Sequence, residues 1–309
     1  MDFRIFVEPQ QGTSYDELLA LATHAEELGF DGFFTSDHYL RMGDVSGLPG
    51  PLDAWITLAG LARDTTRLRL GTLVSPVTFR VPGRLALLVA QVDQMSGGRI
   101  ELGLGAGWYE AEHDALGIQF PDVAERFDRL TEALEVISGI WSTAESDLYS
   151  FEGAHYTLTD NPALPKPWQR PAPPIIIGGR GKRRTPALAA QYASEFNVGF
   201  HDPASWQEIT NNVVEYCEAR ERDPESLVWS AALVAVAAHS EADFSRRAAA
   251  IGRETSELRS SGVAGLVDEV AEKIAQYAAV GCDRMYLQVL DVKDLEHLHV
   301  LAEAAGLTD

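Results

Sequence analysis

Short apolar segments alternate with amphipathic helical segments along most of the chain, and this alternation constrains the fold more than any other feature. Eight segments have the length and composition of strands: residues 4–8, 32–36, 68–74, 100–104, 174–177, 196–199, 228–236 and 284–290. Helices are expected at 15–28, 53–63, 82–95, 123–141, 185–193, 241–259, 267–280 and 295–304. Such alternation is typical of parallel βαβ units, and eight strands are the number that closes a barrel. The sequence therefore predicts an α/β protein with the TIM (β/α)8 barrel fold.

One stretch, residues 142–173, interrupts this rhythm. It contains the proline clusters 161–167 and 171–174 and the aromatic residues Phe151 and Tyr156. Long connections in compact domains are usually functional or disordered. We expect an ordered insertion near 142–173 that runs over the barrel mouth, and a single domain comprising residues 1–309.

The overall charge of the chain disfavours some classes of binding partner. The chain has 25 Lys and Arg against 46 Asp and Glu, a net charge of −21. An acidic chain is a poor ligand for nucleic acids or anionic membranes, and no apolar run has the length of a membrane span. The two cysteines, Cys217 and Cys282, form neither a disulfide framework nor a metal-binding motif. We expect a cytoplasmic protein, no nucleic-acid or membrane partner, and a homodimer as the commonest soluble assembly.

The second predicted strand leads directly into Asp37 and His38. In parallel barrels, catalytic groups lie at the carboxyl ends of strands. An acid beside an imidazole at that end is suited to proton transfer near neutral pH. The alternative is that Asp37 only caps the next segment and that His38 is an ordinary loop residue.

The strand at 174–177 is followed by Gly178, Gly179 and Gly181, and then by a helix. Backbone N–H groups that glycines expose at a helix N-terminus bind anions, phosphate in particular. Lys182, Arg183 and Arg184 add three cations in an otherwise acidic chain. These residues favour an anion site over a flexible turn with solvated charges.

Glycines also follow the fourth strand, in the sequence Gly103-Leu104-Gly105-Ala106-Gly107-Trp108. The segment lacks the last glycine of a dinucleotide fingerprint, so we exclude a Rossmann site. The glycines would let a flat ring approach the backbone beside Trp108, or they only ease a bend. Two Glu/His pairs have di-iron spacing but lack supporting glutamates, and we predict no metal site.

Taken in order, these motifs resemble the bacterial luciferase-like superfamily of flavin and deazaflavin oxidoreductases, and most closely its coenzyme F420-dependent branch. The resemblance covers nearly the whole chain. It rests on segments 32–38, 52–55, 70–74 and 98–108 and on the loop Gly178-Gly179-Arg180-Gly181.

The resemblance implies a TIM barrel with the isoalloxazine-like ring lying across the carboxyl-end mouth. In such enzymes the ring touches the Asp-His pair, here Asp37 and His38, and a non-proline cis peptide lies behind it, near Leu73 and Val74. Two further sets of cofactor contacts are implied. They are Gly105, Ala106, Gly107 and Trp108 for the ring, and Gly178, Gly179, Arg180 and Gly181 for the phosphate. Lys182 and Arg183 are expected to steer the glutamate tail of the deazaflavin.

The chain departs from the sugar-phosphate dehydrogenases of that branch at one position. Their glutamate proton donor is replaced by Trp108, and Glu110 or Glu112 could substitute only if the loop turns inward. We predict a deazaflavin-dependent oxidoreductase that transfers a hydride to or from a small organic substrate. His38 would transfer the proton or polarise the substrate, and Asp37 would fix the ring or the imidazole. The alternatives are an FMN-dependent monooxygenase and a cofactor-binding barrel without turnover.

Overall fold

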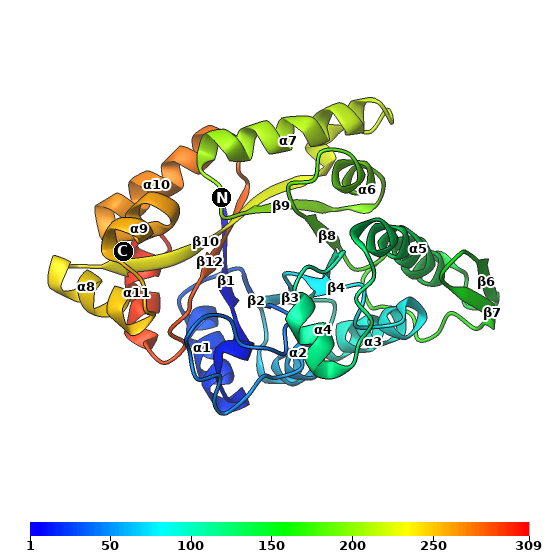
Figure 1. Cartoon of the computed structure of the whole chain (residues 1–309), viewed down its shortest axis with the longest axis horizontal. Helices are drawn as coiled ribbons and strands as arrows, with labels where there is room; N and C mark the ends of the chain where they lie inside the picture. The colour runs from blue at the N-terminus through cyan, green and yellow to red at the C-terminus, as the bar shows by residue number, and fades with distance from the viewer. Residues whose placement is uncertain (309) are drawn as a thin grey trace.

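A closed barrel of eight parallel strands forms the centre of the molecule in the computed structural model, which describes residues 1–308 (Figure 1). The strands are β1 (Asp2–Val7), β2 (Gly32–Thr35), β3 (Arg69–Thr72), β5 (Ile100–Gly105), β8 (Ile175–Gly178), β9 (Glu195–Gly199), β10 (Val228–Ala238) and β12 (Arg284–Gln288). Each strand pairs with the next in this order, and β12 pairs with β1. The TIM-barrel prediction is confirmed.

Helices surround the barrel, and most of them cover the outer faces of its strands (Figure 1). They are α1 (Tyr15–Glu27), α2 (Ala54–Asp64), α3 (Pro82–Ser96), α4 (Glu110–Leu116), α5 (Val123–Ser142), α6 (Arg184–Tyr192), α7 (Pro203–Glu218), α8 (Glu241–Ala250), α9 (Thr255–Ser261), α10 (Val267–Ala279) and α11 (Leu295–Ala304). Ser14 begins α1 with a capping box, and Asp53 caps α2. Such caps satisfy backbone N–H groups that the first helical turn leaves unpaired.

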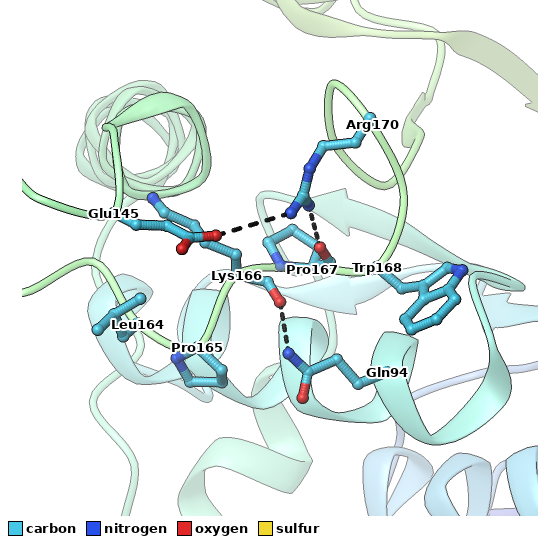
Figure 2. A pocket seen from close by; sticks show the side chains of 8 residues that line it. All are labelled: Gln94, Glu145, Leu164, Pro165, Lys166, Pro167, Trp168 and Arg170. Atoms are coloured by element: carbon cyan, nitrogen blue, oxygen red, sulfur yellow. Dashed lines mark hydrogen bonds and ion pairs between the residues drawn. The ribbon is translucent and has the colours of Figure 1, made fainter.

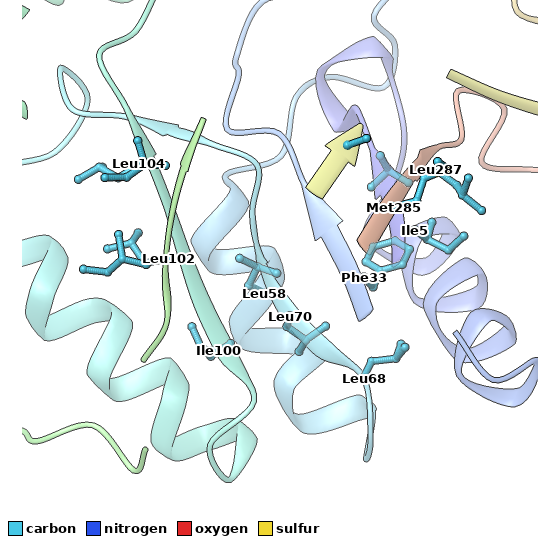
Figure 3. Close-up of a cluster of buried hydrophobic side chains, with 14 of the residues drawn as sticks. Ile5, Phe33, Leu58, Leu68, Leu70, Ile100, Leu102, Leu104, Met285 and Leu287 are labelled. Carbon is cyan, nitrogen blue, oxygen red and sulfur yellow. The ribbon is translucent and has the colours of Figure 1, made fainter. Parts of the chain in front are cut away.

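The main hydrophobic core lies between the strands and the helices. Figure 3 shows part of it, where Ile5 and Phe33 from β1 and β2 lie near Met285 and Leu287 from β12. Leu70, Ile100, Leu102 and Leu104 continue the same layer under α2 and α3 and are all fully buried. Apolar side chains from consecutive strands therefore hold the helices against the barrel, which makes the strand ends a rigid base for a site.

Two differences from the expected elements have local causes. The helix predicted at 241–259 is wrong as a single unit, because it divides into α8 and α9 around Gly252, whose φ of +67° ends α8. Residues 203–218 form α7, which the expected elements omit. Asp202 caps α7 and Pro203 occupies its first turn, a start signal that the sequence does carry.

The insertion does not run over the barrel mouth as predicted. Residues 142–173 contain the hairpin β6 (Tyr149–Glu152) and β7 (Thr157–Asn161), which projects outward beside α5 (Figure 1). Gln169, near its end, hydrogen-bonds Asp93 and the carbonyl of Ile100, at the amino-terminal end of β5. The expected course over the mouth is wrong because this segment joins a helix to the next strand, and such connections lie at the amino-terminal end of a barrel.

Buried charges fill the barrel interior at that amino-terminal end. The guanidinium of Arg4 forms a bidentate pair with Glu101, with contacts of 2.5 and 2.9 Å, and Arg69 donates to the same carboxylate at 2.7 Å. Burial opposes the charge on Glu101, but the neighbouring guanidinium groups lower its pKa to about 2. Both charges are therefore permanent, and the barrel is closed by a packed ionic layer.

No helix among residues 1–308 has both the length and the apolar character that a membrane crossing requires.

Candidate active site

A cavity of about 950 Å³ opens at the carboxyl-terminal end of the barrel. Eight of the predicted site residues line it: His38, Leu73, Val74, Gly107, Trp108, Gly178, Gly179 and Arg180. They lie at or just beyond the ends of β2, β3, β5 and β8, so residues far apart in sequence meet because parallel strands share one end. The peptide between Leu73 and Val74 is cis, at the position that the resemblance implied.

His38 is held in this cavity by a glutamate from α4. Its Nδ1 lies 2.8 Å from Oε1 of Glu112, whose second oxygen accepts the backbone N–H of Tyr39 at 3.1 Å. Glu112 is only 1% exposed and also lines the cavity. The carboxylate therefore receives the Nδ1 proton, and Nε2, which has no hydrogen-bond partner within residues 1–308, is available to a ligand. The loop does turn inward at Glu112, whereas Glu110 is exposed.

The surroundings of His38 favour its protonated form. Burial by itself lowers the pKa of His38, but the hydrogen bond and charge of Glu112 raise it, and the charges of Glu8 and Asp37 act in the same direction. The net effect is a pKa above the usual value for histidine. His38 is thus suited to donate a proton from Nε2 near neutral pH.

Asp37 lies beneath the cavity and does not line it. Its Oδ2 accepts the Ser75 hydroxyl at 2.6 Å and pairs with Arg80, and it makes no hydrogen bond to the His38 imidazole. Burial raises the pKa of Asp37 although Arg80 and Ser75 oppose the change. The group that holds the imidazole is therefore Glu112 rather than Asp37. The contact of Asp37 with the cofactor ring stays a prediction, and its Oδ1 is buried without a hydrogen-bond partner among residues 1–308.

Arg80 connects Asp37 to the first turn of α2. It donates to Asp53 at 2.8 Å and to the Tyr39 hydroxyl at 3.0 Å, and Tyr39 in turn donates to Asp53. Two carboxylates of the protein, those of Asp37 and Asp53, therefore occupy the Arg80 guanidinium.

The glycine loop after β8 lies at the rim of the cavity. Arg180, Lys182 and Arg183 are exposed, and among residues 1–308 none of them forms an ion pair. Gly181 and the two cations after it do not line the cavity itself. Arg184, by contrast, pairs with Asp128 at 2.5 Å and begins α6. The loop therefore presents backbone and three unpaired cations beside the cavity.

The carboxyl-terminal half of β5 is packed too tightly for larger residues. A Cβ at Gly103 would lie 2.0 Å from the Thr72 carbonyl oxygen, and one at Gly105 would lie 2.9 Å from a Val74 methyl. Gly105 and Ala106 are absent from the cavity wall, whereas Gly107 and the exposed Trp108 form part of it. These glycines bring β5 against the Leu73–Val74 peptide.

Several cavity residues carry no motif that predicts them. They include Glu8, Gln11, Gln288, Asn197, Arg253 and Glu257. Glu8 and Gln288 stand at the ends of β1 and β12, and that position in a barrel is the only sequence signal that could have identified them.

A second hollow lies at the opposite end of the barrel and has different walls. Figure 2 shows it between the tail of the insertion and α3, with Gln94 donating to the carbonyl of Lys166 at 2.7 Å. Arg170 approaches Glu145 across it at 4.0 Å. Its wall contains no histidine or glycine and none of the predicted site residues, so the carboxyl-terminal cavity is the candidate active site.

Comparison with known families matches the model of the luciferase-like monooxygenases to residues 1–260. The chain belongs to this family. It is 38% identical over 184 residues to the F420-dependent glucose-6-phosphate dehydrogenase of Microbacterium testaceum, a match that covers 59% of this chain and 52% of that protein. It is 28% identical over 232 residues to the pyrimidine monooxygenase RutA of Klebsiella pneumoniae, covering 71% of this chain and 60% of that protein. The chain thus spans about half the length of the F420-dependent relatives it matches.

Solved structures of several enzymes share the fold over nearly the full chain. An F420-dependent secondary alcohol dehydrogenase in complex with an F420-acetone adduct superposes with a TM-score of 0.83 at 18% identity and covers 100% of this chain and 99% of that one. The monooxygenase RslO1 from Streptomyces bottropensis gives a TM-score of 0.81 at 23% identity and covers 98% of both chains. At these identities the likeness shows the fold alone.

Proposed function

We propose that this protein is a coenzyme F420-dependent oxidoreductase that transfers a hydride between the deazaflavin and a small organic substrate. The observation that carries the proposal is His38, which lines the cavity with Nε2 available while Glu112 holds Nδ1. The F420-dependent glucose-6-phosphate dehydrogenases among the relatives support the choice of cofactor. A cytoplasmic location and a homodimer remain predictions.

The residues around the cavity fit such a cofactor. A volume of about 950 Å³ is within the range of small-molecule sites, and Gly107, Gly178, Gly179 and Gly199 leave parts of the wall as bare backbone. Leu73 and Val74 would contact one face of the ring, and the loop 178–181 would bind the phosphate with backbone N–H groups. Lys182 and Arg183 have no ion pairs among residues 1–308, which suits an acidic tail.

The chemistry of this chain is proton transfer and positioning. When bound in its reduced form, the deazaflavin supplies a hydride to a carbonyl carbon. Protonated His38 donates the Nε2 proton to the carbonyl oxygen, so that an alcohol forms and the imidazole becomes neutral. Glu112 holds the ring through Nδ1 throughout, which keeps Nε2 directed to the substrate. In the reverse direction neutral His38 accepts the alcohol proton.

The test is a titration of the purified protein with coenzyme F420 and, separately, with FMN, followed by fluorescence. We expect F420 to bind with a dissociation constant in the micromolar range or below, and Arg180→Glu to weaken this binding about tenfold. Arg220→Glu is the matched control, because Arg220 is exposed and does not line the cavity. Binding of FMN without any response to F420 would overturn the proposal.

The match to pyrimidine monooxygenase RutA supports a second candidate, an FMN-dependent monooxygenase. Reduced FMN reacts with oxygen, whereas the reduced deazaflavin transfers hydride and hardly does so. The same titration separates the two, since tighter FMN binding together with substrate-dependent oxygen consumption would establish this alternative.

A further inference from the structure

Glu8 lines the cavity because of its position in the barrel. It is the first residue after β1, and Gln288 is the last residue of the neighbouring strand β12, where Phe6 lies opposite Gln288 in the register. Closing the barrel therefore places both side chains at its carboxyl-terminal end, and both line the cavity. Neither residue forms a hydrogen bond with His38, whose Nδ1 partner is Glu112.

Neutral amides alone hold the Glu8 carboxylate. Gln288 donates to Oε1 at 2.7 Å, and Gln10 donates to Oε2. The Gln10 carbonyl accepts the Ser36 hydroxyl at 2.8 Å, which directs its NH₂ group to Glu8. Among residues 1–308 no Lys, Arg or His forms an ion pair with Glu8. Each carboxylate oxygen can accept more than one hydrogen bond, so Glu8 retains acceptor capacity toward the cavity.

The charges on the cavity wall are unevenly distributed. Near His38 there are two carboxylates, Glu8 and Glu112, and the charge of Glu8 contributes to the raised pKa of His38. The lining guanidinium groups, Arg180 and Arg253, come from the loop after β8 and from the α8–α9 connection. Arg253 pairs with Glu257 on the same wall. A ligand group beside His38 and Glu8 therefore meets net negative charge.

We propose that Glu8 is the specificity-determining residue for substrate. It accepts a hydrogen bond from a hydroxyl or amino group on the carbon next to the reacting carbonyl or carbinol carbon, and it disfavours a carboxylate or phosphate there. His38 and Glu8 then recognise two neighbouring substrate groups, the first as a donor and the second as an acceptor. The effect of Glu8 on the rate of substrate oxidation rests on the proposed function, whereas its effect on substrate binding does not.

A matched set of three-carbon secondary alcohols tests this subsite. Propan-2-ol has no second polar group, propane-1,2-diol adds a hydroxyl, 1-aminopropan-2-ol adds an ammonium, and lactate adds a carboxylate. With F420 bound, loss of its absorbance reports oxidation of each alcohol. We expect kcat/KM for the amino alcohol and the diol to exceed that for propan-2-ol about tenfold or more, and lactate to be the poorest substrate. Glu8→Gln should remove the advantage of the amino alcohol over propan-2-ol, measured as the ratio of the two kcat/KM values within each variant, so that a change in the rate common to all alcohols cancels.

Binding of the same alcohols, measured by saturation-transfer NMR, gives a readout without turnover. Glu8→Asp, which keeps the charge, should retain the order of preference. Glu110→Gln, which removes an exposed carboxylate outside the cavity, should behave as the parent. If binding shows the Glu8-dependent order but no alcohol is oxidised, the subsite stands and the proposed function fails. If alcohols are oxidised or bound with the same order of preference in the parent and in Glu8→Gln, the inference is overturned.

Discussion

The two ends of the barrel hold buried carboxylates with different partners. At the amino-terminal end Glu101 pairs with the guanidinium groups of Arg4 and Arg69, whose charges are permanent. At the carboxyl-terminal end Glu112 pairs with His38, whose charge depends on pH. The permanent pairs close the barrel, and the titratable pair faces the cavity. The ion pairs expected to stabilise the fold and the pair expected to transfer protons therefore lie at opposite ends of the same strands.

The largest expected effect is on stability, from breaking the amino-terminal pairs. Glu101→Gln leaves the buried Arg4 guanidinium without its anion, and it should lower the free energy of unfolding by about 3–5 kcal/mol. Urea unfolding followed by circular dichroism measures the change. The exposed Glu152→Gln is the matched control and should change little. A Glu101→Gln protein as stable as the parent would remove the structural role assigned to this end.

At the other end, His38→Ala should separate catalysis from stability. We expect hydride transfer to slow by about 10²–10³-fold, because the proton donor is lost. The dissociation constant for F420 and the urea midpoint should stay close to those of the parent. Single-turnover absorbance measurements give the rate. An unchanged rate in a variant that binds the cofactor normally would contradict the role of His38.

The layer beneath the cavity should respond with an intermediate effect. Ser75 donates to Asp37 and accepts from the Trp55 indole at 3.1 Å, so it joins two elements under the mouth. Ser75→Ala removes a hydrogen bond to a charged group and should cost about 1.5–3 kcal/mol of unfolding free energy. Urea unfolding measures this loss, and a loss as large as that for Glu101→Gln would break the contrast between the two ends.

The smallest expected effect is a shift in the pH dependence of activity and stability. The pKa of His38 is raised in the folded protein relative to the unfolded chain. Its pair with Glu112 therefore contributes its full share to the unfolding free energy at pH values below the pKa of the unfolded state. That contribution is lost as pH rises through the pKa of the folded state. Glu112→Gln should lower the pKa of His38. Carbonyl reduction should then decline at a lower pH than in the parent, and the pH dependence of the unfolding free energy should weaken. Profiles between about pH 5 and 9 measure both changes, and coincident profiles would exclude the coupling.

The sequence was sufficient to predict the barrel and part of the mouth. Apolar strands at regular spacing specify the closed sheet, and strand ends then bring together His38, Val74 and Gly178. Glu112 could not be assigned, because its contact with His38 joins positions 74 residues apart through a short helix without apolar periodicity. Asp37 could not be placed beneath the cavity, since the direction of a side chain beyond a strand end depends on partners such as Arg80.

The course of the insertion was, by contrast, available from chain order. Residues 142–173 lie between a helix and a strand, and that connection belongs to the amino-terminal end whatever its composition. Its prolines and aromatic residues favoured a course over the barrel mouth. In the structure Tyr149 packs against Gly139 of α5 and Leu158 against Gly83 of α3. The connection type is therefore a stronger guide to location than residue content.

The β6–β7 hairpin makes the protein a convenient scaffold for engineering. Its turn, at Gly153–Ala154, projects from the outer helices, and the hairpin is held by the Glu132 carboxylate of α5, which accepts N–H groups of Ala154 and Tyr156 at 2.7 and 3.0 Å. None of the hairpin residues lines the cavity, so a fluorescent reporter or an affinity handle inserted there would leave the cavity wall unchanged. Immobilised on a surface through that turn, the molecule would keep its cavity free of the attachment.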